Sequence, residues 1–186
     1  MPWNLRDVRG LLKASIRDNN PVVFLENEIM YGQEFDVEAD FMDKDFVLPL
    51  DKAHIERQGK DISIVACSKM VGFSLEAAKI LEQEHGIDAE VVNLRIIRPL
   101  DRKTIIDSVK KTNRLVTVEE GWPQHGIGAE ICGMMMESEA FDYLDAPVER
   151  LTGVDVPTPY AVSIEKSAFP QIPNIVDGAL RALYKK

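Results

Sequence analysis

From about residue 61 onward the chain repeats one pattern, a short apolar run followed by a segment with apolar residues at helical spacing. The first run, ISIVACS (62–68), is rich in β-branched residues, which is typical of a strand buried on both faces of a parallel sheet. SLEAAKILEQEHG follows it as a predicted helix. Ser74 is the candidate N-cap of this helix, and Gly86 is its candidate C-terminal stop.

The same pattern predicts three further strands and three further helices. The strands are expected at AEVVNLR (89–95), LVTVEE (115–120) and VERLTG (148–153). The helices are expected to begin at Asp101 as N-cap, at Gly126 (extending to Leu144) and at Asn174 as N-cap. Strands that alternate with helices form right-handed crossovers and a largely parallel sheet covered on both faces. The sequence therefore predicts a three-layer α/β domain.

The first 60 residues do not follow this pattern. NLRDVRGLLKASIRDNN is predicted as a helix capped by Asn4, and VVFLENE as a single strand. An acidic connector follows, with FVLPL as a candidate extended segment. A lone helix and strand cannot bury both of their apolar faces and are marginal by themselves. Two interpretations are open: an extension packed on the main domain, or the last helix and strand of a second domain.

Composition excludes several function classes. Of the 186 residues, 45% are hydrophobic and 28% are charged, as in an ordinary globular protein. No apolar run approaches the ~18–20 residues that cross a bilayer, and MPWNLRDVRG lacks the features of a signal or transit peptide. The net charge of −9 disfavours nucleic acid and favours a basic protein partner. We therefore expect neither a nucleic acid nor a membrane as partner.

The cysteines and histidines do not suggest a metal site. Cys67 and Cys132 lie in apolar contexts and are predicted to be buried, reduced thiols. His54, His85 and His125 are far apart in the sequence, and the chain has no CxxC pair. A zinc site is therefore not expected.

The stretch VEEGWPQHGIGAEI has the most features of a ligand site. Glu119 and Glu120 lie at the carboxyl end of a predicted strand, where open α/β sheets bind their ligands. Gly126 to Gly128 open the next predicted helix, whose first amides can accept an anion. Two acids would repel a phosphate, however, and no dinucleotide fingerprint is complete. Trp122 is expected to pack and His125 to lie on the surface.

Five stretches together carry a family resemblance. They are SIRDNNPVVFLENEIMYG, IERQGKDISIVACS, NLRIIRPLD, LVTVEEGWPQHGIGAEI and FDYLDAPVERLTGVDVPTPYA. The chain resembles the C-terminal half of the beta subunits of thiamine-diphosphate-dependent 2-oxoacid dehydrogenases, in their mitochondrial, pyruvate-specific form. Branched-chain and acetoin-specific relatives share much of the pattern. The resemblance covers essentially the whole chain.

The resemblance implies a fold and a division into domains. Residues 1–45 would be the remnant of a pyrimidine-binding thiamine diphosphate domain, 46–60 a linker, and 61–186 a transketolase-type C-terminal domain. The fold class implied is a three-layer, mostly parallel α/β sheet preceded by the last helix-strand unit of the truncated domain.

The resemblance also implies an enzyme, a pyruvate dehydrogenase heterotetramer of the mitochondrial matrix. It would decarboxylate pyruvate on thiamine diphosphate and magnesium and reductively acetylate lipoyl groups. Its partners would be an alpha subunit and a second beta subunit. The residues that bind the cofactor would lie outside this chain, which would be inactive alone. Glu26 and Glu28, which follow the first predicted strand, would orient a loop or contact a neighbouring subunit.

The end of the first predicted helix is a candidate cation site. Pro21 prevents continuation of the helix, and the carbonyls of the last turn lack intrahelical partners. From the residues alone, an ordinary helix end with solvated polar groups is the simpler interpretation. The resemblance implies a structural potassium ion bound by the carbonyls of Ser15 and Ile16 together with Asp18 and Asn20.

A docking site is also implied by the resemblance. Asp145 in YLDAP and Lys186 at the C-terminus would contact the subunit-binding domain of a dihydrolipoamide acyltransferase. The acids around Asp145 can equally be a solvated face. The alternative function is a free-standing α/β module that binds a small anion or a protein through its strand ends.

Overall fold

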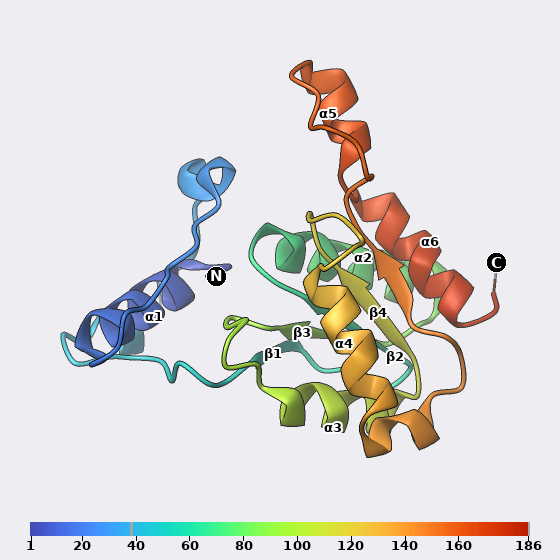
Figure 1. Ribbon diagram of the computed structural model, residues 1–186, viewed down its shortest axis with the longest axis horizontal. Coiled ribbons are helices and arrows are strands. Elements are labelled where there is room, and N and C mark those ends of the chain that lie inside the picture. The colour runs from blue at the N-terminus through green and yellow to red at the C-terminus, as the bar shows by residue number, and fades with distance from the viewer. Residues whose placement is uncertain (38, 186) are drawn as a thin grey trace.

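The computed structural model describes residues 1–37 and 39–185 and contains a five-stranded sheet between two pairs of helices (Figure 1). The strands are β1 (His54–Arg57), β2 (Ile62–Ala66), β3 (Ala89–Asn93), β4 (Leu115–Val118) and β5 (Glu149–Leu151). Their order in the sheet is β1-β3-β2-β4-β5. β3, β2, β4 and β5 run parallel, and β1 pairs antiparallel with β3 at one edge. The predicted mostly parallel sheet is confirmed.

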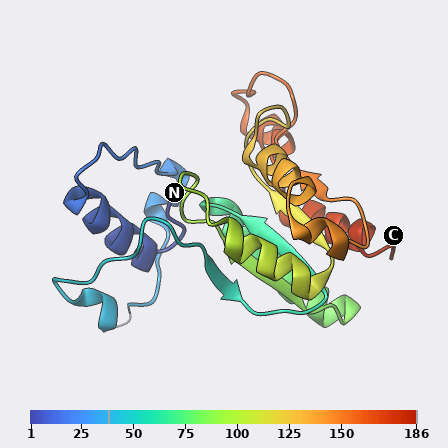
Figure 2. The same ribbon diagram turned by 60° about the horizontal axis from the view of Figure 1, so that its bottom comes forward.

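Helices cover both faces of the sheet, as predicted (Figure 2). One face is covered by α2 (Lys69–His85) and α6 (Ile172–Ala182), and the other by α3 (Arg102–Thr112) and α4 (Ile127–Met136). Successive residues of a strand point to opposite faces, so Ile64 of β2 belongs to the first hydrophobic cluster and Val65 to the second. All five residues of β2 are buried, which explains why its sequence does not alternate.

Several predicted helix boundaries are confirmed. Asn4 caps α1 (Leu5–Arg17), where its side chain accepts a hydrogen bond from the Asp7 amide. Asp101 caps α3 by accepting from the Thr104 amide. Gly86 ends α2 in a left-handed conformation with φ of 63°.

Two predicted N-caps are wrong. α2 begins earlier than expected, after Ser68, and Ser74 is buried inside the helix, where its hydroxyl donates to the Met70 carbonyl at 2.7 Å. α6 begins after Gln171, and Asn174 is the third residue of a capping box, in which its side chain accepts from the Gln171 amide at 2.8 Å. In both cases the side chain bonds to a main-chain group three or four residues earlier, instead of capping the helix as its residue type suggested.

Other segments differ from the prediction in type. FVLPL forms no strand, whereas the strand β1 lies a few residues further on, within the predicted linker. VVFLENE is extended at first but joins no sheet, and its end enters the 3₁₀ turn η1 (Glu28–Gly32). The predicted helix from Gly126 to Leu144 is divided into α4 and the 3₁₀ turn η3 (Glu139–Tyr143). A second short turn, η2 (Asp40–Met42), and the helix α5 (Val162–Ala168) were not predicted.

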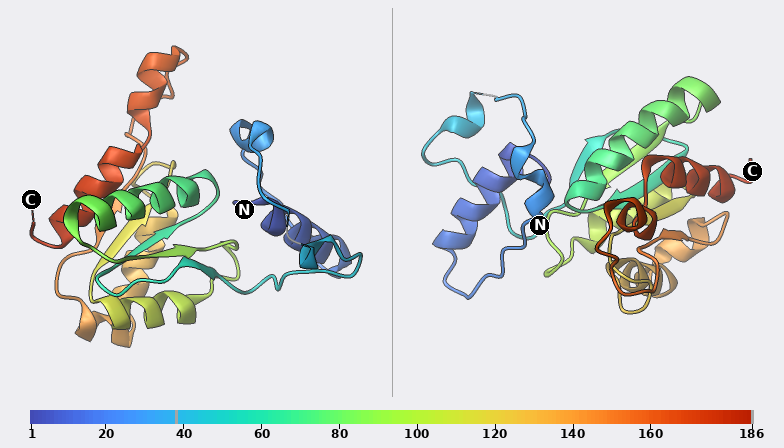
Figure 3. Two further views of the ribbon diagram at one scale, coloured as in Figure 1. Left: turned by 180° about the vertical axis from the view of Figure 1, so that it is seen from behind. Right: turned by 90° about the horizontal axis from the view of Figure 1, so that it is seen from above.

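The N-terminal region lies beside the sheet and contacts it mainly through its first residues (Figure 3). The Trp3 ring packs on Gly72 of α2, where an added Cβ would lie 2.4 Å from the ring. Phe35 meets Trp3 edge to face, with 5.3 Å between the ring centroids. Glycine is therefore required at position 72 by a close approach rather than by backbone conformation. Within the described ranges, no helix combines the length and apolarity that a membrane span needs.

Candidate functional site

A cavity of about 1240 Å³ lies where the parallel strands end at their carboxyl termini. Residues 25–29 of the N-terminal region line one side of it, and Cys67, Ser68 and residues 119–121 line the other. The helices that follow β2 and β4 cover opposite faces of the sheet. Open α/β sheets bind ligands at such a switch point, so this cavity, here called the switch-point cleft, is the candidate site of the domain.

Glu119 occupies the helix end that the sequence suggested for an anion. Its carboxylate accepts the amides of Ile127 and Gly128, each at 2.9 Å, and the residue is only 6% exposed. A Cβ on Gly126 would lie 2.5 Å from one carboxylate oxygen, so glycine permits this close approach. The first amides of α4 are thus paired with the chain's own acid, so Glu119 itself fills the place at this helix start where the sequence left an anion possible.

Glu120 connects the N-terminal region with the sheet across the switch-point cleft. It forms a close ion pair with Lys69 at the start of α2 and accepts a hydrogen bond from the Asn27 side chain at 3.1 Å. Glu26, on the same segment, accepts from the Tyr31 hydroxyl at 2.6 Å, and this bond raises the pKa of Tyr31. Glu28 lines the cleft.

Two further side chains with reactive groups, Cys67 and His125, line the cleft. Burial raises the pKa of the Cys67 thiol to about 11, so the thiol stays protonated at neutral pH. His125 has a positive φ of 60°, is exposed, and its ring contacts the Gln124 side chain at 3.4 Å. Trp122 is 56% exposed, so the expectation that it packs is wrong. Both cysteines are free thiols as predicted, with Cys132 half-buried.

A buried polar junction attaches α1 to the sheet. Asp7 is 0% exposed and lies 2.7 Å from the Arg95 Nε, and its other oxygen accepts from the Asn93 amide at 2.8 Å. The same Asn93 nitrogen donates to Glu56 of β1 at 2.8 Å. Burial raises the pKa of Glu56. Burial also lowers the pKa of His54, and the nearby positive charge of Arg95 lowers it further. Sequence reasoning missed this junction, because its members are far apart in the chain.

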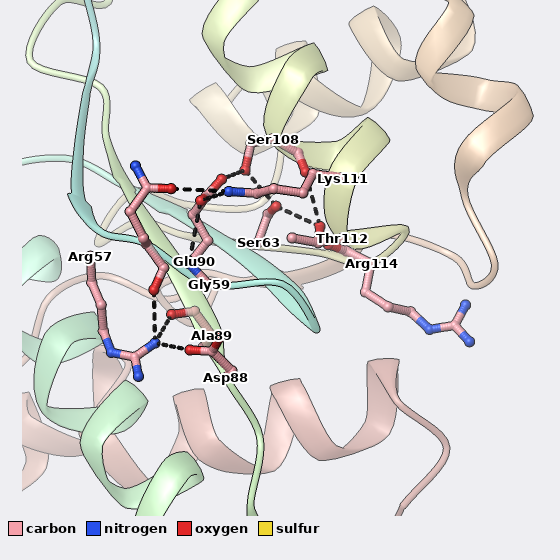
Figure 4. Close-up of polar contacts among 11 residues, drawn as sticks. Arg57, Gly59, Ser63, Asp88, Ala89, Glu90, Ser108, Lys111, Thr112 and Arg114 are labelled. Carbon is pink, nitrogen blue, oxygen red and sulfur yellow. Dashed lines mark hydrogen bonds and ion pairs between the residues drawn. The ribbon is translucent and has the colours of Figure 1, made fainter.

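A second buried network lies at the other end of the strands, near their amino termini (Figure 4). Glu90 of β3 is 1% exposed, accepts the Ser108 hydroxyl at 2.6 Å and pairs closely with Lys111. Ser63 of β2 links to the hydroxyls of Ser108 and Thr112 at 2.6 and 2.7 Å. These groups satisfy one another, so the network holds α3 to the sheet and offers no free group for chemistry.

Asp145 lies on the surface near the amino ends of the strands, beside a hollow of about 450 Å³. Its carboxylate is 62% exposed and lies 3.6 Å from the Arg114 guanidinium, which also stacks on Tyr184 at 5.5 Å. Lys60 and Lys185 line the same hollow. Lys186, the other predicted docking residue, lies outside the described residues.

Of the predicted cation ligands at the end of α1, Ser15, Asp18 and Asn20 line one hollow. The Asp18 carboxylate accepts both the main-chain and the side-chain amide of Asn20, at 2.8 and 2.9 Å, and these bonds lower the pKa of Asp18. The Ser15 hydroxyl donates to the Leu11 carbonyl. The donors are all oxygen atoms, and one of them belongs to an ionised carboxylate, which suits a hard monovalent cation.

Comparison with known proteins gives the family. Residues 51–175 match the family described as transketolase, C-terminal domain. A rice protein (Oryza sativa subsp. japonica), pyruvate dehydrogenase E1 component subunit beta-2, mitochondrial, is 61% identical over 185 residues, which are 100% of this chain and 49% of the rice protein. The yeast (Saccharomyces cerevisiae) subunit is 57% identical over 183 residues, 98% of this chain and 50% of its own length. The mouse (Mus musculus) subunit is 56% identical over 182 residues, which are 98% of this chain and 50% of the mouse protein.

A solved structure with a similar fold is described as split gene transketolase, inactive beta4 tetramer. It superposes with a TM-score of 0.67 at 28% identity, over 77% of this chain and 46% of the other. The chain spans about half the length of the curated relatives it matches. Since the family match covers the whole sheet from the end of the N-terminal region onward, the chain belongs to the transketolase C-terminal domain family.

Proposed function

We propose that this chain is part of the beta subunit of a mitochondrial pyruvate dehydrogenase (acetyl-transferring). The enzyme would decarboxylate pyruvate on thiamine diphosphate and reductively acetylate lipoyl groups. The observation that carries this proposal is the 61% identity with the rice beta subunit over 100% of the chain. The relatives' names place the enzyme in mitochondria, which supports the matrix as its location.

Within that enzyme, the chain would serve assembly rather than chemistry. Among the residues that the structure describes, no three His, Cys, Asp or Glu side chains gather as a metal site. Thiamine diphosphate and magnesium would be held by residues outside this chain. We propose that the chain contacts an alpha subunit and a second beta subunit and turns over no pyruvate by itself.

We divide the chain accordingly: residues 1–45 would belong to a pyrimidine-binding domain, 46–60 to a linker and 61–186 to the transketolase-type domain. The family match from residue 51 supports a boundary in the linker. The junction of Asp7 with Asn93 and Arg95 would then fix one domain against the other.

The surface around Asp145 is proposed to bind the subunit-binding domain of a dihydrolipoamide acyltransferase. Asp145 is exposed, and the chain carries a net charge of −9, so a basic partner would be attracted over a distance. Arg114 already neutralises part of the Asp145 charge. A partner's arginine or lysine would therefore compete with Arg114 for this carboxylate. Lys186 would be the second contact residue.

Calorimetric titration of the chain with that subunit-binding domain tests the proposal. We expect Asp145→Ala to weaken binding about 10-fold, or about 1.4 kcal/mol, and rising salt to weaken the parent more than the variant. Asp155→Ala, which removes an exposed acid from the distant α5 region, serves as the matched control and should leave affinity unchanged. Absence of binding by a folded chain would contradict the docking role and favour a free-standing α/β module.

We also propose a structural potassium ion at the end of α1, with the Ser15 and Ile16 carbonyls, Asp18 and Asn20 as ligands. The all-oxygen donor set supports this site. Cation binding would free the Asp18 carboxylate from the Asn20 side-chain amide and turn that amide's oxygen inward.

Potassium should therefore stabilise the folded chain specifically. At a concentration ten times its Kd, potassium is expected to add about 1.4 kcal/mol to the free energy of unfolding. Thermal unfolding in potassium chloride against tetramethylammonium chloride at equal ionic strength measures this difference. Asp18→Ala should abolish it, whereas Asp51→Ala, an exposed acid elsewhere, should preserve it. An equal response of the parent to both salts would contradict the site.

A further inference from the structure

A small cavity of about 200 Å³ lies between the start of α1 and the η1 turn, and three aromatic side chains line it. Trp3 and Phe35 meet edge to face with 5.3 Å between their ring centroids, so each holds the other in place. Tyr31 of η1 contributes the third ring. The cavity adjoins the switch-point cleft, since residues 26 and 27 line both. The other apolar walls come from Pro2, Leu5, Val8 and Met30.

One carboxylate gives this cavity its charge. Among the described residues that line it, Glu26 is the acid, and none is Lys, Arg or His. The Tyr31 hydroxyl donates to Glu26 at 2.6 Å, which holds the carboxylate beside the ring and raises the pKa of Tyr31, so the hydroxyl stays neutral. The positive end of α1 lies nearby but is balanced by the buried Asp7 in its first turn. The cavity therefore favours a cation over an anion.

The three rings are not used by cations of the chain itself. Within the described ranges, the Lys and Arg side chains that lie over aromatic rings do so at Phe46, Phe73, Phe169, Tyr143 and Tyr184. An aromatic ring attracts a cation placed over its face, and several rings together recognise quaternary ammonium groups. An unmodified ammonium is strongly hydrated and would lose its water in an apolar cavity. A methylated ammonium has no N–H group to satisfy, so it suits apolar walls.

We propose that this cavity, here called the aromatic cage and formed by Trp3, Tyr31, Phe35 and Glu26, binds a quaternary ammonium group. The three rings would attract the positive charge, and Glu26 would balance it. The methyl groups would fill the apolar walls. A free molecule of the choline type and a trimethylated lysine of a peptide both carry this group. The inference goes beyond the proposed function and does not rest on it.

Titration of the chain with choline, followed by tryptophan fluorescence, tests the inference. Trp122→Phe, at an exposed position, leaves Trp3 as the single tryptophan, so the emission reports on the cage. We expect a saturable change with choline. The neutral compound 3,3-dimethylbutan-1-ol has the same shape without the charge and should bind at least about 10-fold more weakly. Equal affinity for both compounds would show that filling of an apolar space, not cation recognition, gives the signal.

Two pairs of variants test the carboxylate and the ring separately. Glu26→Gln removes the charge but keeps an oxygen that can accept the Tyr31 hydroxyl, and it should weaken choline binding about 10-fold. Glu34→Gln, at an exposed acid that does not line the cage, should leave the affinity unchanged.

Tyr31→Phe and Tyr31→Leu both lose the hydroxyl, but only the first keeps a ring. Tyr31 is 70% exposed, so both variants should fold as the parent does. We expect Tyr31→Phe to bind choline at least about 5-fold more tightly than Tyr31→Leu.

Two short peptides, identical except that one carries trimethyl-lysine where the other carries lysine, distinguish the sources of the group. If the trimethylated peptide binds at least about 10-fold more tightly than choline, the cage reads a group on a polypeptide. If choline binds as tightly as that peptide or more tightly, its ligand is a free molecule. Tetramethylammonium carries the same group, so the potassium test keeps Glu26→Gln in every chain that it compares.

Three results would overturn the inference. The first is a folded chain that gives no saturable response to choline or to the trimethylated peptide. The second is equal affinity for the trimethylated and the unmodified peptide, and the third is unchanged choline binding by both Glu26→Gln and Tyr31→Leu.

Discussion

Replacing Asp7 by alanine is expected to lower the free energy of unfolding by about 3–5 kcal/mol, as removal of one member of a buried ion pair does. Asp7 is fully buried, and the Arg95 side chain is 7% exposed. The substitution leaves the guanidinium buried without its counter-charge and the Asn93 amide without one of its two acceptors. Urea unfolding, followed by circular dichroism and by Trp fluorescence, measures the loss.

The ion pair of Arg6 with Asp40 gives the matched control. It also joins α1 to a distant residue with a separation of 2.7 Å, but its side chains are 32% and 57% exposed. Asp40→Ala is therefore expected to leave the free energy of unfolding nearly unchanged. A loss below about 1 kcal/mol for Asp7→Ala would show that α1 detaches at little cost. Hydrogen exchange at the α1 amides would reveal such detachment directly.

Glu119→Ala is expected to cost about 2–4 kcal/mol, because two charge-assisted hydrogen bonds to amides at the start of α4 are lost, one of them buried. The carboxylate also balances the positive end of the α4 dipole. Its removal should create the anion site that the parent lacks, at the amides of Ile127 and Gly128. Sulfate should therefore raise the unfolding midpoint of Glu119→Ala more than that of the parent.

Glu130→Ala is the control for this prediction. Glu130 lies in the same first turn of α4, but its carboxylate is 64% exposed and 3.9 Å from Arg102. Its loss should cost about 0–1 kcal/mol and give no extra response to sulfate. An equal response of both variants to sulfate would mean that the salt acts on the whole protein rather than on the amides of α4.

The features that the sequence predicted well depend on residues close in the chain. Asn4 and Asp101 cap helices by reaching amides within three residues, and Gly86 ends α2 through its own backbone freedom. The buried strands were visible as apolar runs because both of their faces are covered. The order of these elements then indicated a mostly parallel α/β sheet.

The features that the sequence did not show depend on pairing. His54–Arg57 is polar and half-exposed, and it is a strand only because β3 offers its edge. Val22 to Leu25 has a stronger strand pattern but no neighbour to pair with among the described residues, so it remains an isolated extended segment. Whether a segment forms a strand thus depends on a second segment that pairs with it, and the sequence of one segment does not show whether such a neighbour is present.

The same distinction applies to the candidate site. From the sequence alone we identified the acids after the third predicted strand and the glycines that follow, and the family resemblance with its implied cation and docking residues. Only the tertiary structure decided that Glu119 itself fills the start of α4, and that Asp7 meets Asn93, 86 residues away, inside the protein. The physical reason is distance: caps and apolar periodicity act within a few residues, whereas burial and charge pairing are set by parts of the chain that meet only on folding.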